Sequence, residues 1–101
     1  TYYPDTNVMR SNRFMELLSV QEEMKERLIA EYVLVRLDET DKQKVSNTLS
    51  RIVRTTDIIG EGSDGRLYLL LTQANRENFR FVENRLAATG LRYRVTEKVG
   101  G

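Results

Sequence analysis

The chain has 101 residues, of which 40% are hydrophobic and 31% charged, and it contains no cysteine and no histidine. This length and composition indicate one globular domain, and the missing residue types exclude disulfides, thiol nucleophiles, imidazole bases and the usual zinc sites. Sixteen Lys and Arg residues balance fifteen Asp and Glu residues to a net charge of +1. No overall field therefore attracts a nucleic acid polymer or an anionic membrane, and no apolar stretch is long enough to span a bilayer.

The first half of the chain predicts a helix, a strand and a second helix after a lead-in of residues 1–7. Apolar residues spaced by three and four mark the buried face of the first helix. They are Phe14, Leu17, Leu18, Met24 and Leu28. Over residues 32–38 the period changes to two, which predicts a central strand with two apolar faces. Thr40 is a candidate N-cap of the second helix, which we expect to end near Arg54 or Thr55.

The second half predicts a hairpin, a third helix and a last strand. A strand begins at residues 58–59, the glycine-rich segment 60–65 turns the chain, and residues 67–72 return beside it. The third helix begins at Asn75, and the last strand covers residues 91–97. This order predicts an α+β fold with a ferredoxin-like βαββαβ core, in which an antiparallel sheet has helices on one face and an N-terminal helix precedes it.

The segment 60–65 matches the letters of a GxGxxG nucleotide-binding motif. A dinucleotide fingerprint runs from a strand into a helix, whereas we expect a strand to follow here. The glycine loop of protein kinases does lie between strands, but this chain lacks the histidine of their catalytic loop. We therefore interpret the segment as a hairpin turn.

Asp38, Glu39 and Asp41 follow the predicted central strand, a place where carboxylates often hold magnesium. A metal site that handles phosphates needs further oxygen ligands from a second element. The hairpin tip offers only Glu61 and Asp64. We therefore predict no metal site and expect the three acids to serve as the cap and first-turn charges of the second helix.

Arg54, Asp57 and Arg85 form the third candidate site. The first two lie at the end of the second helix, and Arg85 lies on the third helix, which we expect on the same face of the sheet. A carboxylate can accept from the N1 and N2 edge of guanine, and a guanidinium can donate to O6 and N7 or bind a phosphate. The alternative is a helix-end cation at Arg54 and a solvated or salt-bridged Arg85, and the residue types alone leave both interpretations open.

Residues 49–71 resemble the centre of a GGDEF domain, the catalytic domain of diguanylate cyclases. In that family an RxxD inhibitory motif, a five-residue step and the GGDEF hairpin follow one another. Arg54 and Asp57 align with RxxD, residues 58–62 with the step, and residues 63–67 (Ser-Asp-Gly-Arg-Leu) with GGDEF.

The resemblance extends more weakly over most of the chain. Residues 12–14 are similar to the end of the family's leading segment, residues 33–38 to its first strand, and Arg85 has the spacing of its second inhibitory-site arginine. Gly65 and Arg66 stand where the family has the acidic pair that binds metal and the triphosphate. The segment that holds the substrate guanine is also missing. These departures imply a degenerate domain without cyclase activity.

Degenerate GGDEF domains that keep RxxD typically act as receptors for cyclic di-GMP, and this chain most resembles the PelD type, which switches on exopolysaccharide secretion. The resemblance implies that Asp57 accepts from a guanine edge and that Arg54 contacts guanine or a phosphate. It implies that Arg85 takes another guanine or phosphate. Cyclic di-GMP is then the ligand, and no metal or other cofactor is expected.

The resemblance also sets expectations for the whole protein. We expect residues 1–101 to be one domain of a longer multidomain protein, with a neighbouring GAF-type or other sensory domain and a secretion-system partner. Its place would be the cytoplasm, including the cytoplasmic part of an inner-membrane protein. The alternative function is a protein-interaction or homodimerisation module that no longer binds nucleotide, formed by apolar residues outside the main stripe of the leading helix. These are Val8, Met9, Met15 and Val20.

Overall fold

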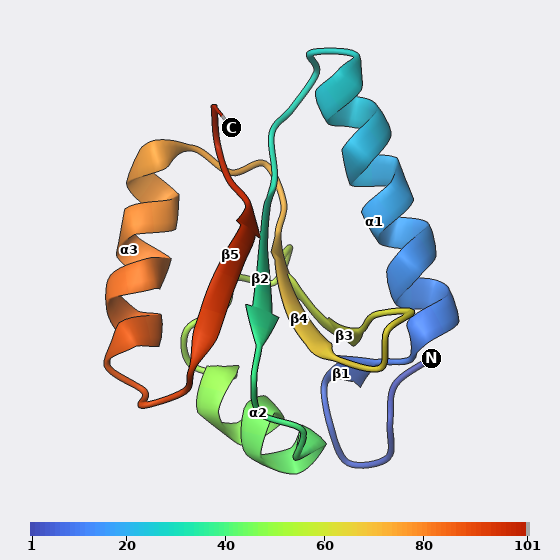
Figure 1. The fold of residues 1–101 in the computed structure, drawn as a ribbon, viewed down its shortest axis with the longest axis vertical. Helices are drawn as coiled ribbons and strands as arrows, with labels where there is room; N and C mark the ends of the chain where they lie inside the picture. The colour runs from blue at the N-terminus through green and yellow to red at the C-terminus, as the bar shows by residue number, and fades with distance from the viewer. Residues whose placement is uncertain (101) are drawn as a thin grey trace.

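The computed structural model describes residues 1–100, which form a five-stranded sheet and three helices (Figure 1). The elements are β1 (Val8–Met9), α1 (Ser11–Glu26), β2 (Val33–Leu37), α2 (Lys42–Leu49), β3 (Ile58–Glu61), β4 (Leu67–Leu71), α3 (Arg76–Ala87) and β5 (Tyr93–Glu97). The strand order is β1-β3-β4-β2-β5. The strands β2 to β5 pair in antiparallel fashion, whereas β1 is parallel to β3. The predicted α+β class with a βαββαβ core after a leading helix is confirmed, with the difference that β1 makes the sheet mixed.

The strand β1 is an element that the sequence did not predict. Val8 and Met9 pair with Ile59 and Gly60 of β3. Val8 is 0% exposed and Met9 5% exposed, so the prediction that these two side chains are free for a partner is wrong. A strand of two residues is too short to show a hydrophobic period, and its pairing with β3 is non-local.

Helices cover both faces of the sheet (Figure 1). α2 and α3 pack on the face that carries Val35, as expected for these two helices. α1 covers the other face, where Phe14 and Leu18 pack with Leu70. The two helices of the βαββαβ core thus lie on one face as predicted, and the leading helix α1, for which no face was predicted, covers the other. The strand β2 serves both cores because its side chains alternate, with Val35 facing one core and Leu34 the other.

The helix α1 ends before its apolar pattern does. Leu28 has a φ of 59° and its side chain is 93% exposed, so its assignment to the buried face is wrong. The N–H of Ile29 donates to the carbonyl of Met24 at 2.9 Å, and this bond ends the helix in a Schellman motif. Within residues 1–100, no helix is both long and apolar enough to cross a membrane.

The helix α2 is shorter than predicted. Asp41, rather than Thr40, is its N-cap, and the Asp41 carboxylate accepts from the backbone N–H of Lys44 at 3.1 Å. At the other end, the Leu49 carbonyl accepts from the N–H groups of both Ile52 and Val53, so the helix gives way to a tight turn. The prediction that the helix reaches Arg54 or Thr55 is therefore wrong, although Ile52 and Val53 still pack against the core.

Gly60 lies where α1 and β3 approach each other most closely. A Cβ atom on Gly60 would lie 2.2 Å from Cδ1 of Phe14. Phe14 is 0% exposed and packed on all sides, so it has little room to move away. The first glycine of the GxGxxG letters is thus required by packing.

We predict that Gly60→Ala lowers the free energy of unfolding by about 1–3 kcal/mol, because the added methyl group overpacks a closed core. Urea denaturation followed by circular dichroism measures this change. Ser63→Ala is the matched control, since Ser63 is exposed on the same hairpin, and it should change stability by less than about 0.5 kcal/mol. Equal stability of Gly60→Ala and the wild type would show that Phe14 can relax.

Candidate functional site

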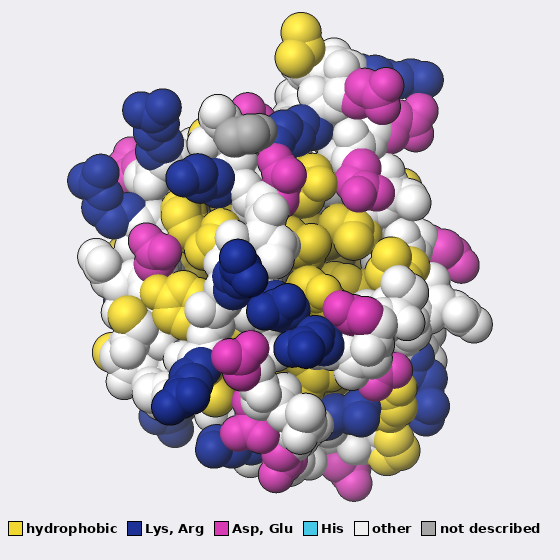
Figure 2. Space-filling view, in the orientation of Figure 1, with side chains coloured by type: hydrophobic (Ala, Val, Ile, Leu, Met, Phe, Trp, Pro, Cys, Tyr) yellow, Lys and Arg dark blue, Asp and Glu magenta, His cyan; other side chains and the backbone are white. Residues whose placement is uncertain are grey.

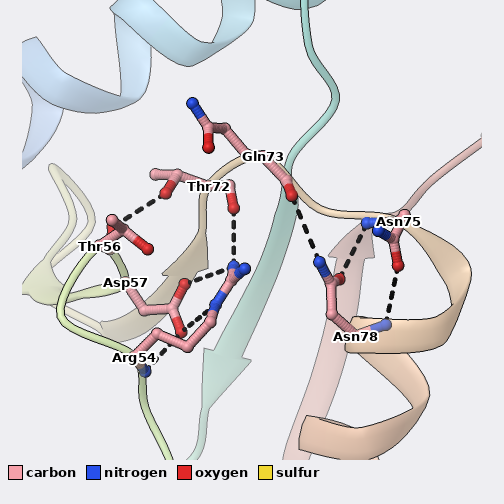
Figure 3. A network of polar contacts seen from close by, with 7 residues as sticks. All are labelled: Arg54, Thr56, Asp57, Thr72, Gln73, Asn75 and Asn78. Carbon is pink, nitrogen blue, oxygen red and sulfur yellow. Dashed lines mark hydrogen bonds and ion pairs between the residues drawn. The ribbon is translucent and has the colours of Figure 1, made fainter.

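Arg54 and Asp57 form a bidentate ion pair between the end of α2 and the start of β3 (Figure 3). Nε and Nη2 of Arg54 donate to Oδ2 and Oδ1 of Asp57 at 3.2 and 2.8 Å. The backbone N–H of Arg54 also donates to Oδ2 at 2.8 Å. Nη2 makes a further hydrogen bond of 2.7 Å to the carbonyl of Thr72, whose hydroxyl donates to the Thr56 carbonyl. The pair therefore joins the turn before β3 to the residue after β4.

The two partners differ in exposure. The Asp57 side chain is 0% exposed, and both of its oxygens accept from Arg54. The Arg54 side chain is 38% exposed, and within residues 1–100 its Nη1 has no hydrogen-bond partner. In this conformation a ligand can reach the arginine, whereas the carboxylate is already occupied.

Arg54 lines a groove of about 330 Å³ beside the start of β3. Tyr2 and Asn7 from the N-terminal segment also line it, together with residues of the 50–57 turn and of β3. Oδ1 of Asn7 is buried and has no partner within residues 1–100. The groove thus combines a cation, an aromatic ring and an amide. Sequence reasoning missed Tyr2 and Asn7 because it did not predict that β1 brings the N-terminal segment beside β3.

Arg85 is not in contact with the Arg54–Asp57 pair. It lies on the exposed side of the last turn of α3, where its guanidinium carbon is 4.3 Å from the ring centroid of Phe81. Arg54 contacts Thr72, which lies four residues before the first residue of α3. Arg85 follows the first residue of that helix by nine positions, which corresponds to about 14 Å along the axis. No hydrogen bond or ion pair within residues 1–100 links Arg85 to the pair.

Of the three acidic residues after β2, Asp41 caps α2 and Glu39 contacts its beginning, but none lies in its first turn, so the prediction of first-turn charges is wrong. Glu39 accepts from the backbone N–H groups of Thr40 and Asp41 and pairs with Lys44 at 2.9 Å. The hydrogen bond from Lys44 is the main reason why the pKa of the Glu39 carboxyl is lowered. Within residues 1–100, no group of three or more His, Cys, Asp or Glu side chains is arranged to hold a metal ion.

The hairpin between β3 and β4 places an arginine beside Asp38. β2 and β4 pair with Leu37 opposite Leu67, and the same register carried one residue further brings Asp38 opposite Arg66. Gly65 occupies the turn with a φ of 79°, which a residue with a side chain adopts only under strain. Positions 65 and 66 of the hairpin therefore carry one glycine and one cation.

Asp64 is held inside the hairpin by two hydrogen bonds. Tyr68 Oη donates to its Oδ2 at 2.7 Å, and the backbone N–H of Arg66 donates to its Oδ1 at 3.0 Å. These bonds, chiefly the one from Tyr68, lower the pKa of the Asp64 carboxyl. Because this pKa is lower in the folded than in the unfolded chain, the ionised carboxyl stabilises the fold above its unfolded pKa. That contribution is lost as the pH falls through the folded pKa.

We predict that Tyr68→Phe raises the pKa of Asp64 toward its ordinary value, because the main hydrogen bond to the ionised form is removed. Carboxyl ¹³C NMR between about pH 2 and 6 measures the titration. Ser63→Ala is the control and should leave the Asp64 pKa unchanged. An unchanged pKa in Tyr68→Phe would assign the shift to another group.

No model of a known protein family matches the chain, and no curated protein matches its sequence. The diguanylate cyclase SiaD of Pseudomonas aeruginosa, solved in complex with its activator SiaC, resembles it with a TM-score of 0.70 and 17% identity. The match covers 99% of this chain and 51% of SiaD, so the chain spans about half of that protein.

A second solved structure, a DGC protein of Thermotoga maritima, has a TM-score of 0.56 and 21% identity. This match covers 90% of the present chain and 80% of the Thermotoga chain. At these identities a structural likeness shows the fold alone. The chain has the fold of diguanylate cyclase domains of the GGDEF type.

Proposed function

We propose that this chain is a catalytically inactive GGDEF-like domain that acts as a cyclic di-GMP receptor through its RxxD motif. The observation that carries the proposal is the position of the Arg54 guanidinium and its hydrogen bonding. Its guanidinium is held by Asp57 and Thr72, lines the groove and keeps Nη1 free. A cation fixed in this way is pre-organised to donate to guanine or to a phosphate, and less side-chain entropy is lost on binding.

In this proposal Arg54 contacts N7 and O6 of guanine or a phosphate. Asp57 orients Arg54 in the free protein. To accept from the N1 and N2 edge of guanine, Asp57 must release Arg54, so one charge-assisted contact replaces another. Arg85 binds another guanine or phosphate from its position on α3, which requires a ligand long enough to reach both arginines, or a second ligand molecule.

We further propose that the domain does not synthesise cyclic di-GMP. Phosphoryl transfer by such enzymes needs carboxylates around divalent cations. The aligned hairpin positions carry Gly65 and Arg66, and the register of β2 and β4 places Arg66 opposite Asp38. A guanidinium at this point repels a divalent cation and competes with it for the carboxylate.

The proposed output is the regulation of exopolysaccharide production of the Pel type or of another biofilm component. The signal would pass from this domain to a neighbouring GAF-type or other sensory domain and to a secretion-system partner. The protein would act in the cytoplasm, including the cytoplasmic part of an inner-membrane protein.

A second candidate function is a protein-interaction or homodimerisation module. The observation that favours it is apolar exposure on α1 and the residues that follow it: Val20 is 48% exposed, Leu28 93% and Ile29 65%. SiaD, whose fold is similar, was solved with a protein activator. An interaction module without a nucleotide site would give no binding heat when it is titrated with cyclic di-GMP in a calorimeter. One such titration therefore distinguishes the two functions.

We predict that the full-length protein binds cyclic di-GMP with a Kd of roughly micromolar order in a calorimetric titration. Arg54→Ala should weaken binding about 10- to 100-fold, because a hydrogen-bonded charge contributes about 1.5–3 kcal/mol. Asp57→Ala should also lose binding. Arg54→Lys, which keeps the charge but not the planar fork, should fall between Arg54→Ala and the wild type.

Two controls accompany the titration. Arg80→Ala removes an exposed arginine of α3 that no polar contact uses within residues 1–100, and it should leave binding unchanged, whereas Arg85→Ala should weaken it. Circular dichroism establishes that each variant is folded, which matters most for the buried Asp57. Absence of binding heat with the full-length wild type would refute the receptor function.

We predict that GTP with Mg²⁺ or Mn²⁺ yields no cyclic product above a protein-free reaction, since the hairpin supplies no carboxylate at positions 65 and 66. Chromatography of the nucleotides measures the product, and an active diguanylate cyclase under the same conditions is the positive control. Steady formation of cyclic di-GMP would overturn the assignment as an inactive domain.

A further inference from the structure

One part of the sheet has no helix over it within residues 1–100. On the α1 side, α1 packs over β1, β3 and β4 and also reaches one end of β2 and β5, where Leu34 joins its core and Lys25 pairs with Glu97. The rest of the surface of β2 and β5 is left open beside it. Arg94 and Thr96 of β5 are exposed there, whereas Tyr93 and Val95 face the core under α3. Two neighbouring strands together are about 10 Å wide. The axes of packed helices are separated by about 8–10 Å, which is a similar distance. The open strip therefore has room for one more helix.

Two arginines lie on this strip, and a third lies beside it. Arg36 and Arg94 are directly opposite each other on β2 and β5, and Arg66 precedes Tyr68, the other cross-strand neighbour of Arg36, by two residues. Within residues 1–100, none of the three guanidinium groups has a hydrogen bond or an ion pair, and Nε of Arg36 is buried without an acceptor. Figure 2 shows Lys and Arg side chains gathered over β5, β2 and β4 near the middle of the view. Like charges that face each other across strands repel, so the sheet itself gains nothing from this arrangement.

An apolar hollow of about 140 Å³ adjoins these arginines. It lies between α1 and the hairpin, and Phe14, Leu18, Leu34 and Tyr68 are among the residues that line it. Asp64 also lines it, with its carboxylate already engaged by Tyr68. Leu34 is two residues before Arg36 on the same face of β2, and Tyr68 is the cross-strand neighbour of Arg36 on β4. Apolar and cationic surface thus continue along one trough beside α1, which we define by Leu34, Arg36, Tyr68 and Arg94.

We propose that this trough is a docking site for an acidic amphipathic helix of a partner protein. Apolar side chains of that helix would fill the hollow, and carboxylates at helical spacing would accept from Arg36 and Arg94. A small anion would satisfy the arginines but leave the hollow empty, and an apolar helix would leave the arginines unpaired. The combination therefore favours a segment that carries both kinds of side chain. The trough shares no residue with the groove of Arg54, so the inference does not depend on cyclic di-GMP binding.

Site-specific photo-crosslinking in the full-length protein, in the cells that produce it, tests the proposal. The crosslinking residue replaces Thr96, which is exposed beside Arg94 and leaves the arginines intact. Mass spectrometry should identify a peptide from another protein with apolar residues and carboxylates at three- and four-residue spacing. Arg94→Glu should lower the yield about tenfold or more, because like charges then meet at the interface.

Arg80→Glu is the matched control, since Arg80 is also an exposed arginine without an ion pair within residues 1–100, but on α3. It should leave the yield unchanged. Peptides only from the same protein would mean that its own segment or a second copy covers the strip, and this would overturn the proposal. A yield that does not respond to Arg94→Glu, or no product above that from a crosslinker at Arg80, would also overturn it.

Discussion

The ion pair between Arg54 and Asp57 is the interaction on which the geometry of the groove depends. The Asp57 carboxylate accepts from the backbone and side chain of Arg54, so it closes the turn that separates α2 from β3. Through Thr72 the same guanidinium reaches the end of β4, just before α3 begins. A buried carboxylate without a partner is costly, so Arg54 can leave Asp57 only when another donor replaces it. Any ligand that takes over either partner would therefore also loosen the link between the turn and β4. In the proposed receptor function, occupancy of the site would therefore change contacts on two segments at once.

Two kinds of element were predicted from the sequence. One has apolar residues that recur at a regular spacing over several positions, and the other begins with a side chain that is typical of a helix N-cap. The strand β2, the hairpin and the start of α3 at Asn75 are such cases, and Asn75 forms a capping box with Asn78. The short strand β1 has no period, and its parallel partner is about fifty residues away in the chain. The end of α1 was misplaced because Leu28 takes a left-handed conformation, which an ordinary leucine does not signal.

The candidate site was predictable as a set of residue types but not as a geometry. A spacing of three residues places Arg54 and Asp57 together, yet it does not say that the two bind each other or that one is buried. The hydrogen bond from Arg54 to Thr72 and the early end of α2 do not show in the local pattern either. Arg85 was grouped with the pair because its helix was expected on the same face of the sheet and because the resemblance gave it a role, and the structure stacks it on Phe81.

The distribution of charge explains how a chain with a net charge of +1 can offer two separate cationic surfaces. Several carboxylates accept hydrogen bonds from nearby residues of the chain. Asp41 caps α2, Asp57 closes a turn, and Asp64 accepts a hydrogen bond from Tyr68 inside the hairpin. Each of these carboxylates neutralises donors of its own segment, so it is not available to arginines elsewhere. Arg36, Arg66 and Arg94 remain unpaired within residues 1–100, and Arg54 is only partly satisfied. Recognition by this domain is therefore governed by where the acids are engaged rather than by the overall charge. The proposed nucleotide groove and the proposed helix trough can then select different anionic partners on one small sheet.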